Sequence, residues 1–244
     1  MTSSGAPARA AGLDVYLARP EPGSRAGVLL LPAANGIAPG LRRCADDLAE
    51  AGLVALAWDP FRGRDVSGLG FPELMPLLGA IQDADALAEQ RALLDHMTGE
   101  LGVERVGVIG WCFGGRLALV LAARERRLAA CVAYHPSIRG ELRPNQTEDA
   151  FALAAGIACP VQWVHPGADQ VITPDVFPVL RDALMGRATG STDLQFHPGA
   201  EHGFMERQTT DANRRATRLA WPQTIAFLRA TLAGDAGTGA ARAG

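Results

Sequence analysis

The 244-residue chain contains no lysine, although it carries 23 arginines. That absence excludes mechanisms that need a lysine side chain, such as a P-loop, a Schiff base or a Ser–Lys dyad. The four cysteines, at positions 44, 112, 131 and 159, form no Cys-x-x-Cys pair, and no His-Glu-x-x-His occurs. We therefore expect neither a metal site nor a cofactor. Cysteines without paired spacing are typical of a reducing compartment, and we expect the protein to be cytoplasmic.

Basic runs and long apolar runs are also missing. A formal net charge of −3 and the lack of any basic run argue against nucleic acid or an anionic membrane surface as a partner. No stretch reaches the roughly 18 apolar residues of a membrane span. The first twelve residues lack the charged-then-apolar layout of a secretory signal. We expect a small-molecule partner, and the sequence leaves the oligomeric state open between a monomer and a small homo-oligomer.

Apolar, β-branched runs alternate with helical patterns along most of the chain. Strands are predicted at 13–18, 26–31, 54–58, 106–109, 128–134, 158–165 and 194–197. Helices are predicted at about 40–51, 80–97, 116–123 and 210–232. This alternation predicts an α/β fold, with a mostly parallel sheet flanked by helices on both faces, in a single domain of residues 13–233. We expect disorder at 1–12, a long loop over the site at 63–79 and a mobile tail at 234–244.

The pattern centres on residues 110–115, Gly-Trp-Cys-Phe-Gly-Gly, between a predicted buried strand and a predicted helix. Gly-x-nucleophile-x-Gly in that context is a nucleophile elbow, here with Cys112 where serine is usual. The glycines allow a strand and a helix to pack closely around a strained residue. The helix N-terminus supplies N–H groups and partial positive charge that favour a thiolate and an oxyanion. Taken alone, the motif is also compatible with an ordinary tight turn.

Two other predicted strand ends carry the partners that a nucleophile needs. Ligands of parallel α/β folds bind at the carboxyl ends of strands, where Asp169 follows strand 158–165 and His202 follows strand 194–197. The order nucleophile, acid, histidine is that of the α/β-hydrolases. His202 would take the thiol proton, and Asp169 would orient the imidazole. Asp169 alone could be a turn residue, and His197 is a competing histidine within the strand.

These segments resemble the dienelactone hydrolase family, a cysteine-nucleophile branch of the α/β-hydrolases. The matching segments are 110–115, Gly-Ala-Asp at 167–169 and Pro-Gly-Ala-Glu-His-Gly-Phe at 198–204, within a resemblance that covers roughly residues 13 to 232. It implies an α/β-hydrolase fold and cleavage of an ester, lactone or thioester through an acyl-Cys112 intermediate, without a cofactor. It also implies an oxyanion hole made by the backbone N–H groups of Phe113 and Ala34.

Two positions depart from the family pattern. A Glu that pairs with the resting thiol in well-studied members is replaced by Ala33. We therefore expect His202 to activate Cys112 directly, and iodoacetamide to label the thiol rapidly near neutral pH. The family's carboxylate-binding Arg, four residues after the histidine, is replaced by Glu206, with Arg207 beside it. A carboxylate clamp is thus not predicted there, and a less polar ester or lactone than dienelactone is favoured.

Several aromatic and polar side chains are candidates for contact with the substrate, and any of them could equally be a packing residue. They are Asn35, Phe61, Trp111, His135, Phe204 and Arg207. His165, which ends a strand as His135 does, could also line the pocket. Hydrolysis of a C–X or C–C bond on the same scaffold is a related possibility. The alternative function is a non-catalytic α/β-hydrolase scaffold that binds a small molecule or a protein. The missing Glu favours that alternative, and the intact Cys–His–Asp set argues against it.

Overall fold

A computed structural model describes residues 5–233, so the expectations for residues 1–4 and for the tail 234–244 lie outside the described residues. One eight-stranded sheet has the order β1-β2-β4-β3-β5-β6-β7-β8. The strands are β1 (Ala6–Ala10), β2 (Leu13–Ala18), β3 (Ala26–Leu31), β4 (Val54–Trp58), β5 (Arg105–Trp111), β6 (Leu128–Tyr134), β7 (Val161–Ala168) and β8 (Thr192–Glu201). All pairings from β4 to β8 are parallel, and the two antiparallel pairings are those of β2 with β1 and with β4. The mostly parallel sheet predicted from the sequence is confirmed.

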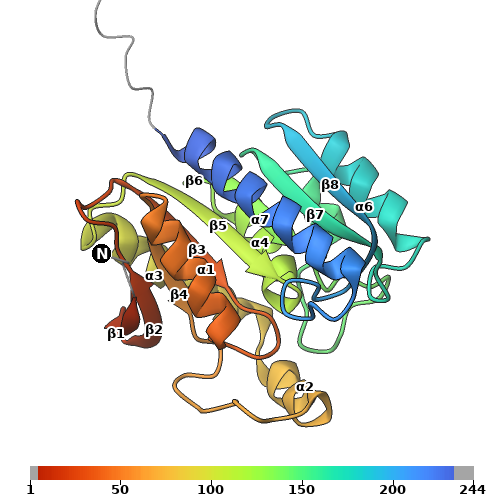
Figure 1. The fold of residues 1–244 in the computed structure, drawn as a ribbon, viewed down its shortest axis with the longest axis horizontal. Helices are drawn as coiled ribbons and strands as arrows, with labels where there is room; N and C mark the ends of the chain where they lie inside the picture. The colour runs from red at the N-terminus through yellow and green to blue at the C-terminus, as the bar shows by residue number, and fades with distance from the viewer. Residues whose placement is uncertain (1–4, 234–244) are drawn as a thin grey trace, which may run out of the picture.

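Helices cover both faces of the sheet (Figure 1). They are α1 (Pro39–Glu50), α2 (Phe71–Ala80), α3 (Asp83–Gly99), α4 (Phe113–Arg124), α5 (Ala150–Ala154), α6 (Val176–Met185) and α7 (Asp211–Leu232). One apolar cluster joins the sheet to α1 and α7, and the other joins it to α3, α4, α5 and α6. In β3, Val28 and Leu30 belong to the first cluster, and Leu29 and Leu31 belong to the second. The strand is apolar without interruption because both of its faces are covered.

The N-terminal residues differ from the sequence expectation. Residues 6–10, expected to be disordered, form β1 and pair with β2. The hairpin turn consists of Ala11 and Gly12, which both have positive φ, at 49° and 78°. Two positive φ values in a row are typical of the tight turn whose twist matches paired strands. β1 therefore forms the edge of the sheet, next to the strand that was predicted at residues 13–18.

The predicted loop over the site also differs, because residues 71–80 form α2. Pro72 stands in the first turn of this helix, where a missing N–H leaves no helical hydrogen bond unmade. Glu73 accepts the N–H of Gly70 at 2.7 Å and so caps the helix start. Figure 1 shows α2 standing clear of the layered body, and only Leu74 and Leu78 are buried. Within residues 5–233, no helix has the length and apolar character to cross a membrane.

Candidate active site

Cys112 lies at the turn between β5 and α4, in a strained backbone conformation. Its φ of 51° and ψ of −111° fall in a region that costs energy for any residue other than glycine. The N–H of Cys112 donates to the carbonyl of Tyr134 at 3.1 Å, and its own carbonyl accepts the N–H of Ser137 at 2.8 Å. The strained residue is thus held by the end of β6 and by the segment that follows it.

Two glycines make this turn possible. A Cβ added to Gly110 would run into the backbone of Gly114, and one added to Gly114 would run into the carbonyl of Leu31. With no side chain at these positions, the start of α4 packs directly on the loop after β3. The N–H of Gly114 donates to the carbonyl of Pro32 at 3.0 Å. The glycines expected from the motif therefore have the packing role that the sequence predicted.

Asp169 and His202 come from the ends of two neighbouring strands, β7 and β8. Nδ1 of His202 lies 3.0 and 3.1 Å from the two carboxylate oxygens of Asp169. Asp169 also accepts the N–H groups of Val171 and Ile172, at 2.7 and 3.3 Å. Burial by itself would raise the pKa of Asp169, but His202 and these backbone donors outweigh it and lower the pKa. The carboxylate is therefore charged although its side chain is fully buried.

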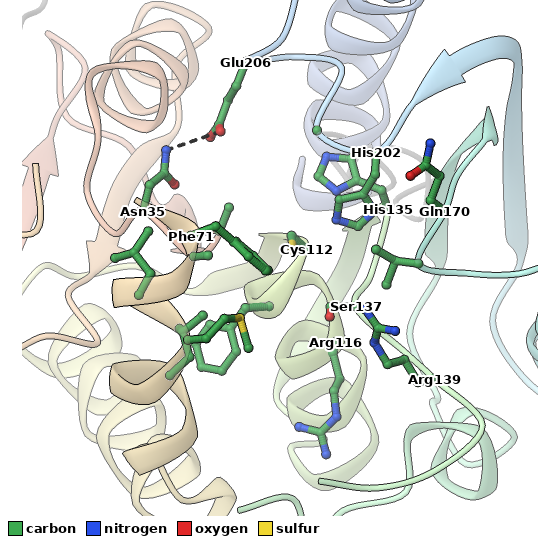
Figure 2. Close-up of a pocket in the computed structure, with 18 of the residues that line it drawn as sticks. Asn35, Phe71, Cys112, Arg116, His135, Ser137, Arg139, Gln170, His202 and Glu206 are labelled. Atoms are coloured by element: carbon green, nitrogen blue, oxygen red, sulfur yellow. Dashed lines mark hydrogen bonds between the residues drawn. The ribbon is translucent and has the colours of Figure 1, made fainter. Parts of the chain in front are cut away.

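The imidazole of His202 interacts with this carboxylate and with the thiol of Cys112, and Figure 2 shows its ring on the same side of the cavity as His135. Burial alone would lower the pKa of His202. The hydrogen bond to Asp169 and the thiol of Cys112 act in the opposite direction and raise the pKa to about 9. Nε2 of the ring is buried and has no hydrogen-bond partner among the described residues. With a pKa of about 9, the imidazole of His202 is protonated at neutral pH.

The backbone donors expected for an oxyanion hole lie beside Cys112. Phe113 begins α4, and Ala34 belongs to the loop after β3 that contacts it; both residues line the same cavity as Cys112. Neither N–H donates a hydrogen bond to another residue of the described part of the chain. Two unused N–H groups next to a nucleophile can receive a negatively charged oxygen.

The cavity above Cys112 has a volume of about 480 Å³ and two chemically different walls. Figure 2 shows one wall on the side of α2 and the other on the side of Ser137 and Arg139. The α2 wall is apolar, and consists of Phe71, Leu74, Met75 and Leu78. The opposite wall is polar and comes from the 135–149 loop, through Ser137, Arg139, Arg143 and Gln146. Within residues 5–233, the guanidinium groups of Arg139 and Arg143 form neither an ion pair nor a hydrogen bond.

The structure brings only some of the predicted substrate-contacting residues into this cavity. Asn35, His135 and Arg207 line it, and the side-chain amide of Asn35 donates to Glu206 at 3.3 Å. The aromatic candidates Phe61, Trp111 and Phe204 do not line it.

Each of these aromatic side chains lies outside the cavity above Cys112. Phe204 is fully buried in the core against Tyr134. Trp111 points to the other side of the sheet and lines a second cavity of about 200 Å³, while Phe61 packs over Gly36. Their place near a strand end was visible in the sequence, but the side of the backbone to which each ring turns was not.

The remaining histidines also separate into two groups. His135 lines the cavity, whereas His165 and His197 are buried outside it. His202, and not the competing His197, is the histidine that bonds to Asp169. Burial lowers the pKa of His197, whose ring packs 5.7 Å from that of Phe204.

A buried ion pair lies under the polar wall. Arg116 of α4 donates to both carboxylate oxygens of Asp83 at 2.7 Å, and both side chains are 3% exposed. Asp83 also accepts the N–H groups of Thr147 and Glu148, at 2.9 and 3.0 Å. The pair thus ties α3 and α4 to the loop that carries Arg139. No group of three or more His, Cys, Asp or Glu side chains in residues 5–233 is placed to hold a metal ion.

The sheet order, the elbow at the end of β5 and the site at the strand ends define an α/β-hydrolase. More narrowly, the chain belongs to the dienelactone hydrolase family, whose model matches residues 13–232. It is therefore a hydrolase of that family, as the sequence predicted.

Two named relatives are similar over most of the chain, and a solved structure shares its fold. The chain is 26% identical to a carboxymethylenebutenolidase of Rhodococcus opacus, over 85% of this chain and 82% of that protein. It is 28% identical to a probable 2-oxo-3-(5-oxofuran-2-ylidene)propanoate lactonase of a Bradyrhizobium species, over 90% of each. The crystal structure of a dienelactone hydrolase-like promiscuous phosphotriesterase from metagenomic libraries superposes with a TM-score of 0.73 at 21% identity, covering 90% of this chain and 93% of that one.

Proposed function

We propose that the protein hydrolyses a carboxylic ester or lactone through an acyl-cysteine intermediate on Cys112. The observation that carries the proposal is the arrangement of three groups. A thiol on a strained elbow lies next to a protonated imidazole, and a buried carboxylate holds that imidazole at 3.0 Å. Family membership supports the same bond class, because the relatives named above are a butenolidase and a lactonase.

In the first half of the reaction, the thiolate of Cys112 attacks the ester carbonyl carbon. The N–H groups of Phe113 and Ala34 would stabilise the oxyanion that forms. His202 would then give its proton to the departing alkoxide, and Asp169 would keep the ring oriented while its charge changes. In the second half, the now neutral His202 removes a proton from water, which attacks the acyl carbon and releases the acid. The thiolate–imidazolium pair is thereby restored.

The cavity walls suggest the kind of ester. We expect the apolar part of the substrate to lie along α2 and an anionic group to lie near Arg139 and Arg143, whose guanidinium groups have no acidic partner in the described chain. This interpretation changes the expectation of a less polar substrate. The cationic side chains are present, but on a different loop from the positions at which the sequence was compared with the family.

Burst kinetics test the proposed function. Short-chain p-nitrophenyl esters should give a burst of p-nitrophenol, and intact mass spectrometry of quenched enzyme should show one acyl group on Cys112. C112A should show neither. A wild-type enzyme without burst, adduct or turnover on p-nitrophenyl and lactone substrates would contradict the proposal and favour the non-catalytic scaffold.

A further inference from the structure

His135 is the second residue of the site with a strained backbone. Among the non-glycine residues of the described chain, positive φ occurs only at Ala11, Arg62, Cys112 and His135. Cys112 and His135, with φ of 51° and 33°, follow the neighbouring strands β5 and β6 and line the same cavity. Strained residues persist where the surroundings hold them, and they gather at functional sites. We therefore expect His135 to have a role beyond packing.

The surroundings of His135 fix its ring beside the reacting groups. Its N–H donates to the carbonyl of Val164 in β7 at 2.9 Å, and this hydrogen bond holds the end of β6 beside β7. The ring centroid lies 4.6 Å from that of His202 and 6.0 Å from that of Phe204, edge to face in both cases. Figure 2 shows both imidazole rings next to Cys112.

The two nitrogens of His135 have different environments. Nδ1 is fully buried and has no hydrogen-bond partner among the described residues. Nε2 also forms no hydrogen bond with the described protein, and on a residue that is only 2% exposed it is the ring nitrogen that keeps some accessible surface toward the cavity. The thiol of Cys112 interacts with the ring of His202, so that ring lies where the acyl group is attached. The pKa of His135 lies well below its ordinary value. Burial is the largest cause and the charge of His202 is the second, while Asp169 acts in the opposite direction and raises the pKa. The ring is therefore neutral.

We propose that His135 holds the water molecule that hydrolyses the acyl-Cys112 intermediate, an inference that rests on the proposed function. The water oxygen forms a bond to the acyl carbon, and the C–S bond breaks with its electron pair returning to sulfur. One water proton passes to Nε2 of His202, which became neutral when it protonated the leaving alcohol. Nε2 of His135 hydrogen-bonds the same water and fixes its direction of attack. A water with two protein partners is oriented, whereas one with a single partner can rotate.

Two substitutions separate this role from packing. H135N keeps a residue that tolerates positive φ and removes the ring, and H135F keeps the ring contacts and removes both nitrogens. We expect the acylation burst to stay within about threefold of wild type. Steady-state turnover should fall about 100-fold, and the acyl-Cys112 species should accumulate in intact mass spectra. Hydroxylamine, which attacks a thioester without a positioned water, should restore turnover. H197F, which removes a buried histidine that also packs on Phe204, is the matched control and should leave deacylation unchanged.

These experiments distinguish a failure of the role of His135 from a failure of the proposed function. Unchanged deacylation in whichever of H135N and H135F folds, as judged by circular dichroism, overturns the inference. A parallel loss of burst and turnover also overturns it, since His135 would then act by positioning His202. A wild-type enzyme without any acyl-enzyme would instead refute the proposed function itself.

Discussion

The pKa values of two neighbouring imidazoles in the site are shifted in opposite directions. His202 is held by Asp169 and the thiol, so its pKa is raised to about 9 despite burial. His135 has only one buried, unpartnered nitrogen and one that faces the cavity, and burial keeps its pKa well below the ordinary value. One ring is therefore a proton donor at neutral pH and the other a neutral hydrogen-bonding group. Adjacent titratable groups with separated pKa values are typical of sites that carry out proton transfer.

The raised pKa of His202 predicts the alkaline limb of the pH profile. Acylation by an ester with a poor leaving group needs the protonated imidazole, so kcat/KM should fall as the pH rises through about 9. The limb should be measured with an ethyl ester, because p-nitrophenolate leaves without a proton. In D169N, the loss of the hydrogen bond that raises this pKa should move the limb to lower pH. A limb at the same pH in both proteins would contradict the assignment of His202 as the acid.

At the scale of single residues, the placement of three polar residues at strand ends could be predicted, and the directions of the aromatic side chains could not. Cys112, Asp169 and His202 stand in motifs whose spacing places them at strand ends, and the sheet then brings them together. Phe204 follows His202 by two residues, yet its ring turns into the core. A positive φ such as that of His135 also leaves no mark in the sequence, because it is imposed by contacts with β7.

Among the elements, α2 and the 135–149 loop decide the shape of the cavity. α2 was not predictable from periodicity, because its two prolines and its glycine are typical of loops and it buries only two side chains. α5 was likewise missed, since it has only five residues. The long strands and helices of the two-sided core were predicted within a few residues, because their apolar pattern is set by burial on the sheet.

Because the 135–149 loop places arginines in the cavity wall, we expect the protein to prefer esters that carry an anionic group. R139Q should raise KM for the p-nitrophenyl monoester of adipic acid about tenfold, which is the loss of one charge-assisted hydrogen bond. KM for p-nitrophenyl hexanoate, an ester of the same chain length without the charge, should change little. R64Q is the matched control, because Arg64 is an exposed arginine outside the cavity. Equal effects of R139Q on both esters would exclude an anionic subsite at this loop.

At the scale of the whole molecule, the buried pair of Asp83 and Arg116 joins parts of the chain that are far apart in sequence. The carboxylate accepts four hydrogen bonds, two from the guanidinium and two from the backbone of residues 147 and 148. A helix on one side of the site, the helix of the elbow and the polar wall are thereby fixed together.

Removal of one partner should therefore destabilise the fold strongly. D83A should lower the free energy of unfolding by about 3–5 kcal/mol, because it leaves the guanidinium of Arg116 buried without a counter-charge. Guanidinium chloride unfolding measures the change. D95A, which removes the exposed partner of Arg127, is the control and should have a much smaller effect. The double variant D83L/R116M should recover part of the loss, and equal effects of D83A and D95A would contradict the structural role of the pair.

The order of the strands has a consequence for the time at which the thiol becomes reactive during synthesis. Cys112 is made well before His202, and the strand that brings His202 into place, β8, pairs only with β7 at the edge of the sheet. Under the proposed mechanism, the growing chain therefore contains the nucleophile before its acid–base partner has been made. Cys112 meets that partner only when the last strand, β8, docks on β7.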